Sequence, residues 1–276
     1  SRPDWLKKKI RLNNSNINQI KNLICSLHLN TVCQSAKCPN IFECFSKRTA
    51  TFMLMGDICT RNCGFCGIKS GKPEELDINE PYRVAEAVKE AKLKYVVVTS
   101  VTRDDLNDGG SAHFAKTVSE IRKLNPDTKI ECLIPDFKQE TSNLKVLLSE
   151  DLSVLCHNME TVRENYNRVR RNSNYEISLD ILKSVKKLKP EAYTKSGFML
   201  GLGEKKEEIK RLLTRLDQSV PKRKFRDTGI GIVVKGNVAV WERVEEAVTS
   251  DGRITTVPGI DAFEFRGDKI QHLRVY

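Results

Sequence analysis

Residues 49–67, "TATFMLMGDICTRNCGFCG", join a short apolar segment to a loop that carries three cysteines. The gaps between Cys59, Cys63 and Cys66 are three residues and then two. A structural zinc site closes with four protein ligands, and this loop supplies only three. Iron–sulfur clusters are also held by thiolates, one per iron. Because three thiolates on a four-iron cluster leave one iron free, the loop predicts a cluster with an open coordination position.

The region that follows this stretch alternates short apolar runs with amphipathic segments of helical period, as far as about residue 204. A strand–helix–strand order predicts a parallel sheet, and five such units indicate a full or partial α/β barrel or an open doubly wound sheet. The predicted strands are residues 49–56, 95–100, 129–135, 152–158 and 194–203. The predicted helices are residues 80–93, 111–126, 140–151 and 178–190.

Polar or glycine-rich segments follow four of these strands. They are "GDICTRNCGFCG", "SVTRDDLNDGG", "HNMETV" and "GLGEKKEE". In both architectures the chemistry gathers at the carboxyl ends of the strands. We therefore expect these four loops to lie along one rim and to form the functional site.

Composition limits the class of protein. The chain has 276 residues, of which 39% are hydrophobic and 30% charged, and it contains no apolar run of eighteen residues, so we expect no membrane span. The net charge of +11 comes from basic residues spread along the chain, without interleaved aromatic residues. This pattern favours a solvated basic surface over a nucleic-acid footprint, and it also fits an acidic protein partner. Zinc-mediated nucleic-acid binding is a weaker alternative.

Cysteine usage points to metal chemistry. Seven of the nine cysteines fall in the first quarter of the chain, and the count is odd. A disulfide scaffold would be shorter and evenly paired, so the pattern predicts metal ligation in a reducing compartment. We expect the cytoplasm, or an organelle with a reducing interior if the N-terminus, which lacks an initiator Met, is processed. Cys132 and Cys156 lie in apolar runs and are expected to be buried, and Cys25 receives no role.

A second cysteine triplet precedes the first strand. In "VCQSAKCPNIFECF" the gaps between Cys33, Cys38 and Cys44 are four residues and then five. Taken alone, this spacing is equally compatible with a zinc knuckle and with an iron–sulfur cluster.

Together the two triplets resemble a known family. The loop with gaps of three and two, directly after the first strand, looks like the radical S-adenosylmethionine superfamily. The second triplet and the segments "CPNIFECF", "YVVVTSVTRDDLNDGGSAHFA" and "TKSGFMLGLGE" resemble lipoyl synthases over about residues 2–216. The resemblance implies an α/β fold, a partial parallel (β/α) barrel with a cysteine-rich N-terminal extension.

The same resemblance implies a reaction. Two 4Fe–4S clusters would be present, one on Cys59, Cys63 and Cys66 that binds and cleaves S-adenosylmethionine. The other, on Cys33, Cys38 and Cys44, would be the sulfur donor. Two sulfur atoms would enter carbons six and eight of a protein-bound octanoyl group to make lipoyl. The implied partners are an octanoylated lipoyl carrier domain or octanoyl-lysine peptide and an external electron donor, with no nucleic acid and no membrane.

The resemblance also suggests which rim residues hold the cofactor. They are Thr99, Ser100, Asp105, Asp108, Gly109, Gly110, Asn158, Glu160, Arg170 and Ser178. Asp and Gly clusters are also ordinary turn chemistry, and the arginines of "NRVRRN" fit a solvated helix face nearly as well. His157 is expected to be a packing residue rather than an iron ligand.

Three regions are expected along the chain: an N-terminal extension (1–48), a partial barrel of the radical SAM type (49–219) and a β-rich tail (220–276). The tail departs from lipoyl synthases and predicts antiparallel hairpins, with a weak resemblance to the last hairpin of SnoaL-like proteins. It lacks the family's sixth strand, unless residues 229–236 replace that strand. It also lacks the serine that, in the family, is the fourth protein ligand of the second cluster. A non-catalytic or impaired iron–sulfur or metal-binding protein is therefore the alternative function.

Overall fold

The computed structural model describes residues 15–36, 38, 41–46, 48–190, 192–219, 223–235, 238–248, 254–266 and 269–275. The chain forms two compact units. The first comprises residues 1–62 and 66–156, and the second residues 63–65 and 157–276. The division into three regions at residues 48 and 219 stays a prediction.

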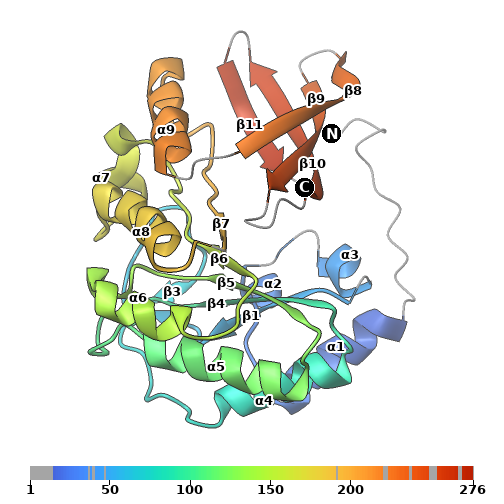
Figure 1. The fold of residues 1–276 in the computed structure, drawn as a ribbon, viewed down its shortest axis with the longest axis vertical. Coiled ribbons are helices and arrows are strands. Elements are labelled where there is room, and N and C mark those ends of the chain that lie inside the picture. The colour runs from blue at the N-terminus through green and yellow to red at the C-terminus, as the bar shows by residue number, and fades with distance from the viewer. Residues whose placement is uncertain are drawn as a thin grey trace. The chain divides into compact units, whose positions relative to one another are not determined.

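Five parallel strands form one sheet in the order β1-β4-β5-β6-β7 (Figure 1). Its strands are β1 (Ala50–Leu54), β4 (Tyr95–Ser100), β5 (Lys129–Leu133), β6 (Val154–Cys156) and β7 (Tyr193–Lys195). Each lies inside or overlaps one of the five predicted strands. The α/β class with a parallel sheet is therefore confirmed, and the strand order given is that of an open sheet.

Strand register aligns the carboxyl ends of the first four strands. Leu54 lies opposite Ser100, Thr99 opposite Leu133, and Leu133 opposite Cys156. The β-branched run of β4 supplies the buried Val96 and Val98, which suit a strand that is covered on both sides. Because the strands end level, the loops that follow them begin at one edge, as the sequence predicted.

Helices α4 (Glu80–Glu90), α5 (Ser111–Leu124) and α6 (Thr141–Leu148) lie side by side on one face of the first four strands (Figure 1). Their apolar residues recur at helical spacing and are buried, as with Val84 and Val88 of α4. All three helices lie within predicted ranges, and the burial of Cys132 and Cys156 was also predicted.

The N-terminal extension contains α1 (Ser15–Ser26), α2 (Val32–Ser35) and α3 (Ile41–Ser46). Between α1 and α2 the chain runs along the outer edge of β1. The Met53 N–H donates to the Asn30 carbonyl at 2.8 Å, and Thr31 forms a bridge with Phe52. The edge of β1 is thereby covered, which removes a site for unwanted strand pairing.

The second unit has its own core around α8 (Tyr175–Leu188) and α9 (Lys206–Ser219). The core residues are Met159, Val162, Tyr166, Tyr175, Leu179, Leu182, Leu212 and Leu216. Helix α8 begins three residues before the predicted helix because the Asn174 side chain caps it, accepting the Glu176 N–H at 2.9 Å.

The tail forms a four-stranded antiparallel sheet in the order β11-β10-β9-β8. Its strands are β8 (Arg223–Lys235), β9 (Val238–Val248), β10 (Ile254–Arg266) and β11 (Lys269–Val275). The predicted hairpins are confirmed. The idea that residues 229–236 replace a sixth parallel strand is wrong, because the described residues 229–235 belong to β8, which pairs with β9 in this separate sheet.

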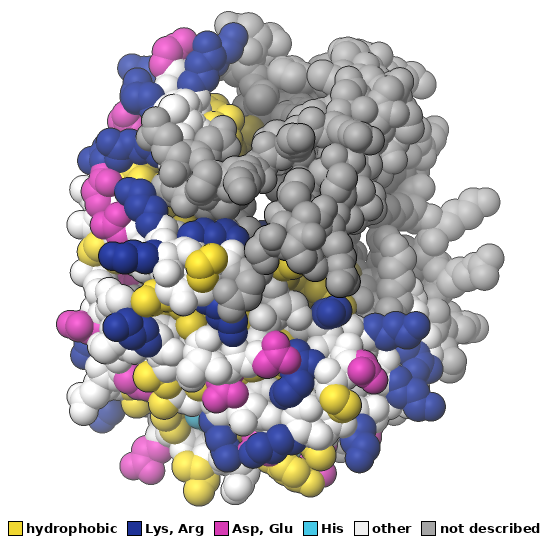
Figure 2. Space-filling model, viewed as in Figure 1, with side chains coloured by type: hydrophobic (Ala, Val, Ile, Leu, Met, Phe, Trp, Pro, Cys, Tyr) yellow, Lys and Arg dark blue, Asp and Glu magenta, His cyan; other side chains and the backbone are white. Residues whose placement is uncertain are grey.

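Among the described residues, no helix is both long enough and apolar enough to cross a membrane. Figure 2 shows Lys and Arg side chains interspersed with Asp and Glu over the visible described surface. The excess positive charge therefore does not form one continuous patch on this face, in line with the solvated surface expected from the sequence.

Candidate functional site

The first cysteine loop leaves the sheet directly after β1 and is closed at its base by a short parallel ladder. Strand β2 (Ile58–Cys59) pairs with β3 (Lys69–Ser70), and the Gly71 N–H donates to the Cys59 carbonyl at 2.9 Å. Cys59 and Cys63 are half-buried, and Cys66 is exposed. The ladder fixes both ends of the loop, and none of its three cysteines is fully buried.

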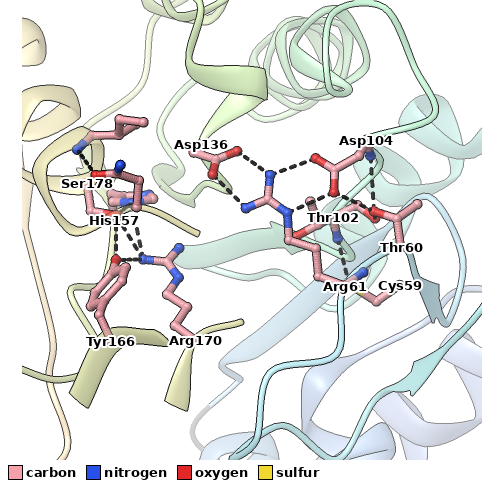
Figure 3. A network of polar contacts seen from close by, with 12 residues as sticks. Cys59, Thr60, Arg61, Thr102, Asp104, Asp136, His157, Tyr166, Arg170 and Ser178 are labelled. Atoms are coloured by element: carbon pink, nitrogen blue, oxygen red, sulfur yellow. Dashed lines mark hydrogen bonds and ion pairs between the residues drawn. The ribbon is translucent and has the colours of Figure 1, made fainter. Parts of the chain in front are cut away.

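The sulfur of Cys59 is held by backbone groups. It accepts the N–H of Arg61 at 3.4 Å and the N–H of Thr102, in the loop after β4, at 3.3 Å (Figure 3). Hydrogen bonds to the sulfurs tune the potential of a bound cluster. The donor set of three soft thiols, one of them already oriented, fits an iron–sulfur cluster.

Arg61, between the first two cysteines, is buried and joins the loops after three strands (Figure 3). Its Nε and Nη2 donate to the two Asp104 carboxylate oxygens at 2.8 and 2.6 Å. Its Nη1 and Nη2 donate to Asp136 at 2.6 and 2.9 Å. Bidentate pairs of this kind are strong and geometrically specific. The cysteine loop is thus tied to the loops after β4 and β5.

The charges of this cluster reinforce one another. Burial alone would lower the pKa of Arg61, but the hydrogen bonds to Asp104 and Asp136 raise it above its usual value. Burial also pushes the Asp104 pKa upward, yet the Arg61 guanidinium brings it below its ordinary range. All three members were missed at the sequence level. The signal was present, because Asp136 follows a buried strand directly and Arg61 lies inside the cysteine loop.

The end of β1 is held by a second buried cluster. The Glu80 carboxylate accepts the Met55 N–H at 2.9 Å and lies 2.7 Å from His113 Nε2. Arg103 contacts the Met55 carbonyl at 3.4 Å and makes a bidentate pair with Asp105. Met55 has a positive φ of 66°, so these groups hold a strained residue at the point where the chain turns into the cysteine loop.

Asp108 and Thr99 have protein partners of their own. The Asp108 carboxylate accepts the N–H groups of Gly110 and Ala112 at 2.9 and 2.8 Å, which caps the start of α5. The Thr99 hydroxyl donates to the Leu133 carbonyl on the neighbouring strand at 2.8 Å. Their assignment as cofactor contacts, like that of Asp105, stays a prediction.

Packing requires glycine at position 109, and the positive φ angles favour glycine at both 109 and 110. A Cβ on Gly109 would lie 2.9 Å from Phe137 Cα, and one on Gly110 would lie 2.5 Å from the Met55 side chain. Both glycines also have positive φ angles, 62° and 90°. The backbone at these glycines therefore comes close to other parts of the protein, namely Phe137 and Met55.

Ser100, at the end of β4, differs from its neighbours. Its Oγ is buried and has no hydrogen-bond partner among the described residues. An unpaired buried hydroxyl is costly. The assignment of Ser100 as a cofactor contact stays a prediction.

In the second unit, four side chains gather after β6 (Figure 3). The Ser178 hydroxyl lies 2.7 Å from the Tyr166 hydroxyl and 3.0 Å from His157 Nε2. Arg170 donates through Nη1 to the Asn158 carbonyl at 2.7 Å, to Tyr166 Oη at 2.8 Å and to Ser178 at 3.1 Å. His157 is fully buried, which agrees with its expected role in packing. Arg170 and Ser178, predicted together, meet here.

Arg170 uses one nitrogen for these contacts. Its Nε and Nη2 make no hydrogen bond or ion pair to described residues, so one edge of the guanidinium is available to a ligand. Asn158 Oδ1 accepts the Gly197 N–H at 3.0 Å. Burial raises the pKa of Glu160, while Arg170 and the Asn158 side chain act in the opposite direction. Asn158, Glu160 and Arg170 thus form one group.

The second triplet lies on α2, α3 and the segment between them. The Cys38 N–H donates to the Cys33 carbonyl at 3.0 Å, which closes a turn between the first two cysteines. Cys33 is buried, and its pKa is raised chiefly by burial. Among the described residues, no three His, Cys, Asp or Glu side chains are arranged as a metal site. The assignment of the six cysteines as ligands, made from donor type and spacing, stays a prediction.

Comparison with known proteins decides the family. The model of the Radical SAM superfamily matches residues 53–216. A lipoyl synthase of Caldicellulosiruptor saccharolyticus is 55% identical over 215 residues, covering 78% of this chain and 75% of that protein. A lipoyl synthase of Psychromonas ingrahamii is 49% identical over 216 residues, covering 78% and 67%. The chain belongs to the lipoyl synthase family of the radical SAM superfamily.

Solved structures agree on the fold. Methylornithine synthase matches with a TM-score of 0.51 at 16% identity, covering 77% of this chain and 64% of that one. The enzyme HydG, a maturase of the FeFe hydrogenase, matches with the same score and identity, covering 74% and 52%. At these identities the likeness concerns the fold alone.

Family membership makes the chain a radical SAM enzyme of the sulfurtransferase type, as the sequence predicted. A 4Fe–4S cluster and S-adenosylmethionine follow from the superfamily. The alternative of a non-catalytic metal-binding protein receives no support from the comparisons. The family model ends at residue 216, which agrees with the predicted end of the resemblance.

Proposed function

We propose that this protein inserts two sulfur atoms, at carbons six and eight, into an octanoyl group carried by a protein. The observation that carries the proposal is the three-thiol loop at the carboxyl end of β1, with the Cys59 sulfur held by two backbone N–H groups. Cys59, Cys63 and Cys66 would hold a 4Fe–4S cluster. That cluster, when bound, supplies the electron that cleaves S-adenosylmethionine and so starts hydrogen removal from an unactivated C–H bond.

Two groups of side chains, each considered within its own unit, have contacts to offer S-adenosylmethionine. In the first unit, the unpaired hydroxyl of Ser100 offers a hydrogen bond. In the second unit, Arg170 presents a free guanidinium edge that suits a carboxylate. Glu160 and Asn158 beside it provide oxygen atoms for an ammonium group. The buried hydroxyls of Ser178 and Tyr166 accept hydrogen bonds from Arg170 and hold it in place, and because they are neutral they leave its charge uncompensated.

Cys33, Cys38 and Cys44 would hold a second 4Fe–4S cluster, and this cluster would donate the sulfur. The edge of β1 brings the start of this triplet next to the strand that leads into the first cysteine loop. The substrate would be an octanoylated lipoyl carrier domain or an octanoyl-lysine peptide, with electrons from an external donor. The net charge of +11 suits an acidic carrier.

The test begins with anaerobic reconstitution and counting of iron and sulfide. Two clusters support the proposal, and stoichiometric zinc without sulfide contradicts it. The loaded protein is then given an octanoyl-lysine peptide, S-adenosylmethionine and a reductant. We expect 5′-deoxyadenosine and a doubly thiolated peptide. If 5′-deoxyadenosine forms without thiolated product, the proposed sulfur donation is wrong while cleavage of S-adenosylmethionine stands.

A matched control separates the two triplets. Replacing Cys33, Cys38 and Cys44 together by Ala should remove four of about eight irons and abolish thiolation, while 5′-deoxyadenosine is still produced. Replacing Cys59, Cys63 and Cys66 should abolish both products. If the two triple variants behave alike, the separate roles proposed for the triplets are wrong.

A further inference from the structure

The loop after β5 contains an unusual run of backbone angles. Phe137, Lys138 and Gln139, which form the short helical turn η2 (Phe137–Gln139), have φ angles of 43°, 55° and 69°. Left-handed conformations are costly for residues with a Cβ, and three in succession are rare. Such strain persists only where the surroundings hold it, and it concentrates at functional positions.

The surroundings of this turn do hold it. The Phe137 ring is buried and packs edge-on against Phe114, with the centroids 5.5 Å apart. The Phe137 carbonyl accepts the Asn143 side-chain N–H at 3.1 Å. The Gln139 N–H donates to the Asp136 carbonyl at 2.7 Å. Ring packing and hydrogen bonds thus fix the turn from both sides.

Gly109 completes this arrangement from the loop after β4. A Cβ at this position would lie 2.9 Å from Phe137 Cα and 3.1 Å from Phe137 C, both of them backbone atoms. Backbone atoms cannot move aside as the end of a flexible side chain does. Only glycine therefore allows the strained turn to come this close to the loop after β4.

The turn begins directly after Asp136, whose carboxylate is almost fully buried and receives two hydrogen bonds from Arg61. We propose that the left-handed turn Phe137–Gln139 is a positioning device for the cysteine loop. Asp136 and Arg61 are its positioning residues. The Asp136 carboxylate holds the Arg61 side chain, and the backbone N–H of Arg61 fixes the sulfur of Cys59. Its importance for the reaction rests on the proposed function, but the fixing of the Cys59 sulfur does not.

The decisive experiment measures the reactivity of Cys59 in the full-length, metal-free protein. Native protein is alkylated for increasing times and then digested, and the modified peptides are counted by mass spectrometry. Trypsin cleaves after Arg48 and Arg61, so Cys59 is read on residues 49–61, apart from Cys63 and Cys66. Cys25, which is exposed on α1, serves as the internal reference. It shares the tryptic peptide 22–37 with the buried Cys33, so fragmentation of that peptide assigns the modified cysteine.

In Asp136→Asn and Gly109→Ala we expect Cys59 to be alkylated about tenfold faster than in the wild type, with Cys25 unchanged. Both changes weaken the charged hydrogen bonds that fix Arg61, so its backbone N–H no longer holds the Cys59 sulfur, and the sulfur becomes easier to reach. Asp151→Asn, which removes an exposed ion pair with Arg122, is the matched control and should leave Cys59 unchanged. Unaltered Cys59 reactivity in a folded Asp136→Asn variant overturns the proposal. Circular dichroism establishes folding, and if Gly109→Ala does not fold, Asp136→Asn decides.

A second readout uses the loaded protein. The electron paramagnetic resonance spectrum of the reduced cluster should respond more weakly to S-adenosylmethionine in Asp136→Asn than in Asp151→Asn. A variant that loses only thermal stability, with an unchanged spectrum and unchanged Cys59 reactivity, contradicts a positioning role. If the wild type forms no 5′-deoxyadenosine, the proposed function fails, while the alkylation experiment still decides whether the turn fixes Cys59.

Discussion

Two arginines of this protein are surrounded by opposite kinds of partner. Arg61 is buried between two carboxylates and uses both edges of its guanidinium in ion pairs. Arg170 is half-buried and bonded through one nitrogen to a carbonyl and two hydroxyls, all of them neutral (Figure 3). The first arginine has its charge compensated inside the protein, whereas the second keeps an available edge.

This difference separates structure from binding. A guanidinium with two carboxylates has nothing left to offer a ligand, so Arg61 can only hold the loops together. A guanidinium anchored by neutral groups keeps its charge and has already lost its side-chain freedom, so it binds an anion at lower entropic cost. We therefore expect changes at Arg61 to affect the loop and changes at Arg170 to affect affinity.

The largest effect is expected for Cys59→Ala, which tests whether the loop that Arg61 holds is the catalytic one. The loop cluster would lose one of its three protein ligands. We expect formation of 5′-deoxyadenosine to fall to background, measured by chromatography of quenched reactions. Cys25→Ala is the control and should retain activity. Substantial activity in Cys59→Ala would break the comparison, because Arg61 would then serve a loop without a catalytic role.

Arg170→Gln tests the available edge. A charge-assisted carboxylate contact contributes about 2 kcal/mol, so the Kd for S-adenosylmethionine should rise about thirtyfold. The measurement is anaerobic calorimetry on the loaded protein. Arg171→Gln, which changes the exposed neighbour, should leave the Kd unchanged. Equal affinities in both variants would show that Arg170 is merely structural, like Arg61.

The two carboxylates paired with Arg61, Asp104 and Asp136, test its structural role. Their side chains are exposed to different degrees, 3% for Asp136 and 37% for Asp104. Asp136→Asn should therefore lower the free energy of unfolding by about 3 kcal/mol, as expected for a buried pair. Asp104→Asn should cost about 1 kcal/mol, nearer to a surface pair. Urea unfolding of the metal-free proteins measures both, and the reverse order would contradict the assigned burial.

The smallest effect concerns Glu160, whose pKa is raised by burial. A carboxyl with a raised folded-state pKa stabilises the fold below its unfolded pKa of about 4.3 and loses that contribution as pH rises through the folded pKa. Glu160→Gln should consequently raise stability at neutral pH and have little effect near pH 4. Thermal unfolding across this range tests the sign. A Glu160→Gln variant that is less stable at pH 7 would indicate that Arg170 outweighs the burial of the carboxylate.

Sequence reasoning found the elements whose signals are local. The run "YVVVTS" could be assigned from β-branched residues alone, and the thiol loop from its spacing. Helix α9 was missed although Ile209, Leu212 and Leu216 recur at helical spacing, because its many charged residues suggested a loop. Helix α1 was not predicted either, because it lies in an Asn-rich region without a clear element pattern.

The Arg61 cluster was missed for a different reason. The sequence places Arg61 in the cysteine loop and Asp136 after a predicted strand, but it does not show that Arg61, Asp104 and Asp136 are neighbours. Their contacts depend on strands that end level at one edge of the sheet. Asp105 was chosen as a ligand contact, whereas Asp104 beside it points to Arg61. Adjacent residues in a loop face different ways, and only the folded backbone decides which of them faces inward.

The bridge between Thr31 and Phe52 has a consequence for how the chain tolerates insertions and deletions. It sets the offset between the two cysteine triplets, because Cys33 lies two residues beyond one partner and Cys59 seven beyond the other. A residue added in the exposed stretch between Cys66 and α4 leaves that offset untouched. A residue added between Thr31 and Cys33, or between Phe52 and Cys59, shifts one triplet against the other. The pairing at the edge of β1 thus fixes the offset along the chain between the two cysteine triplets.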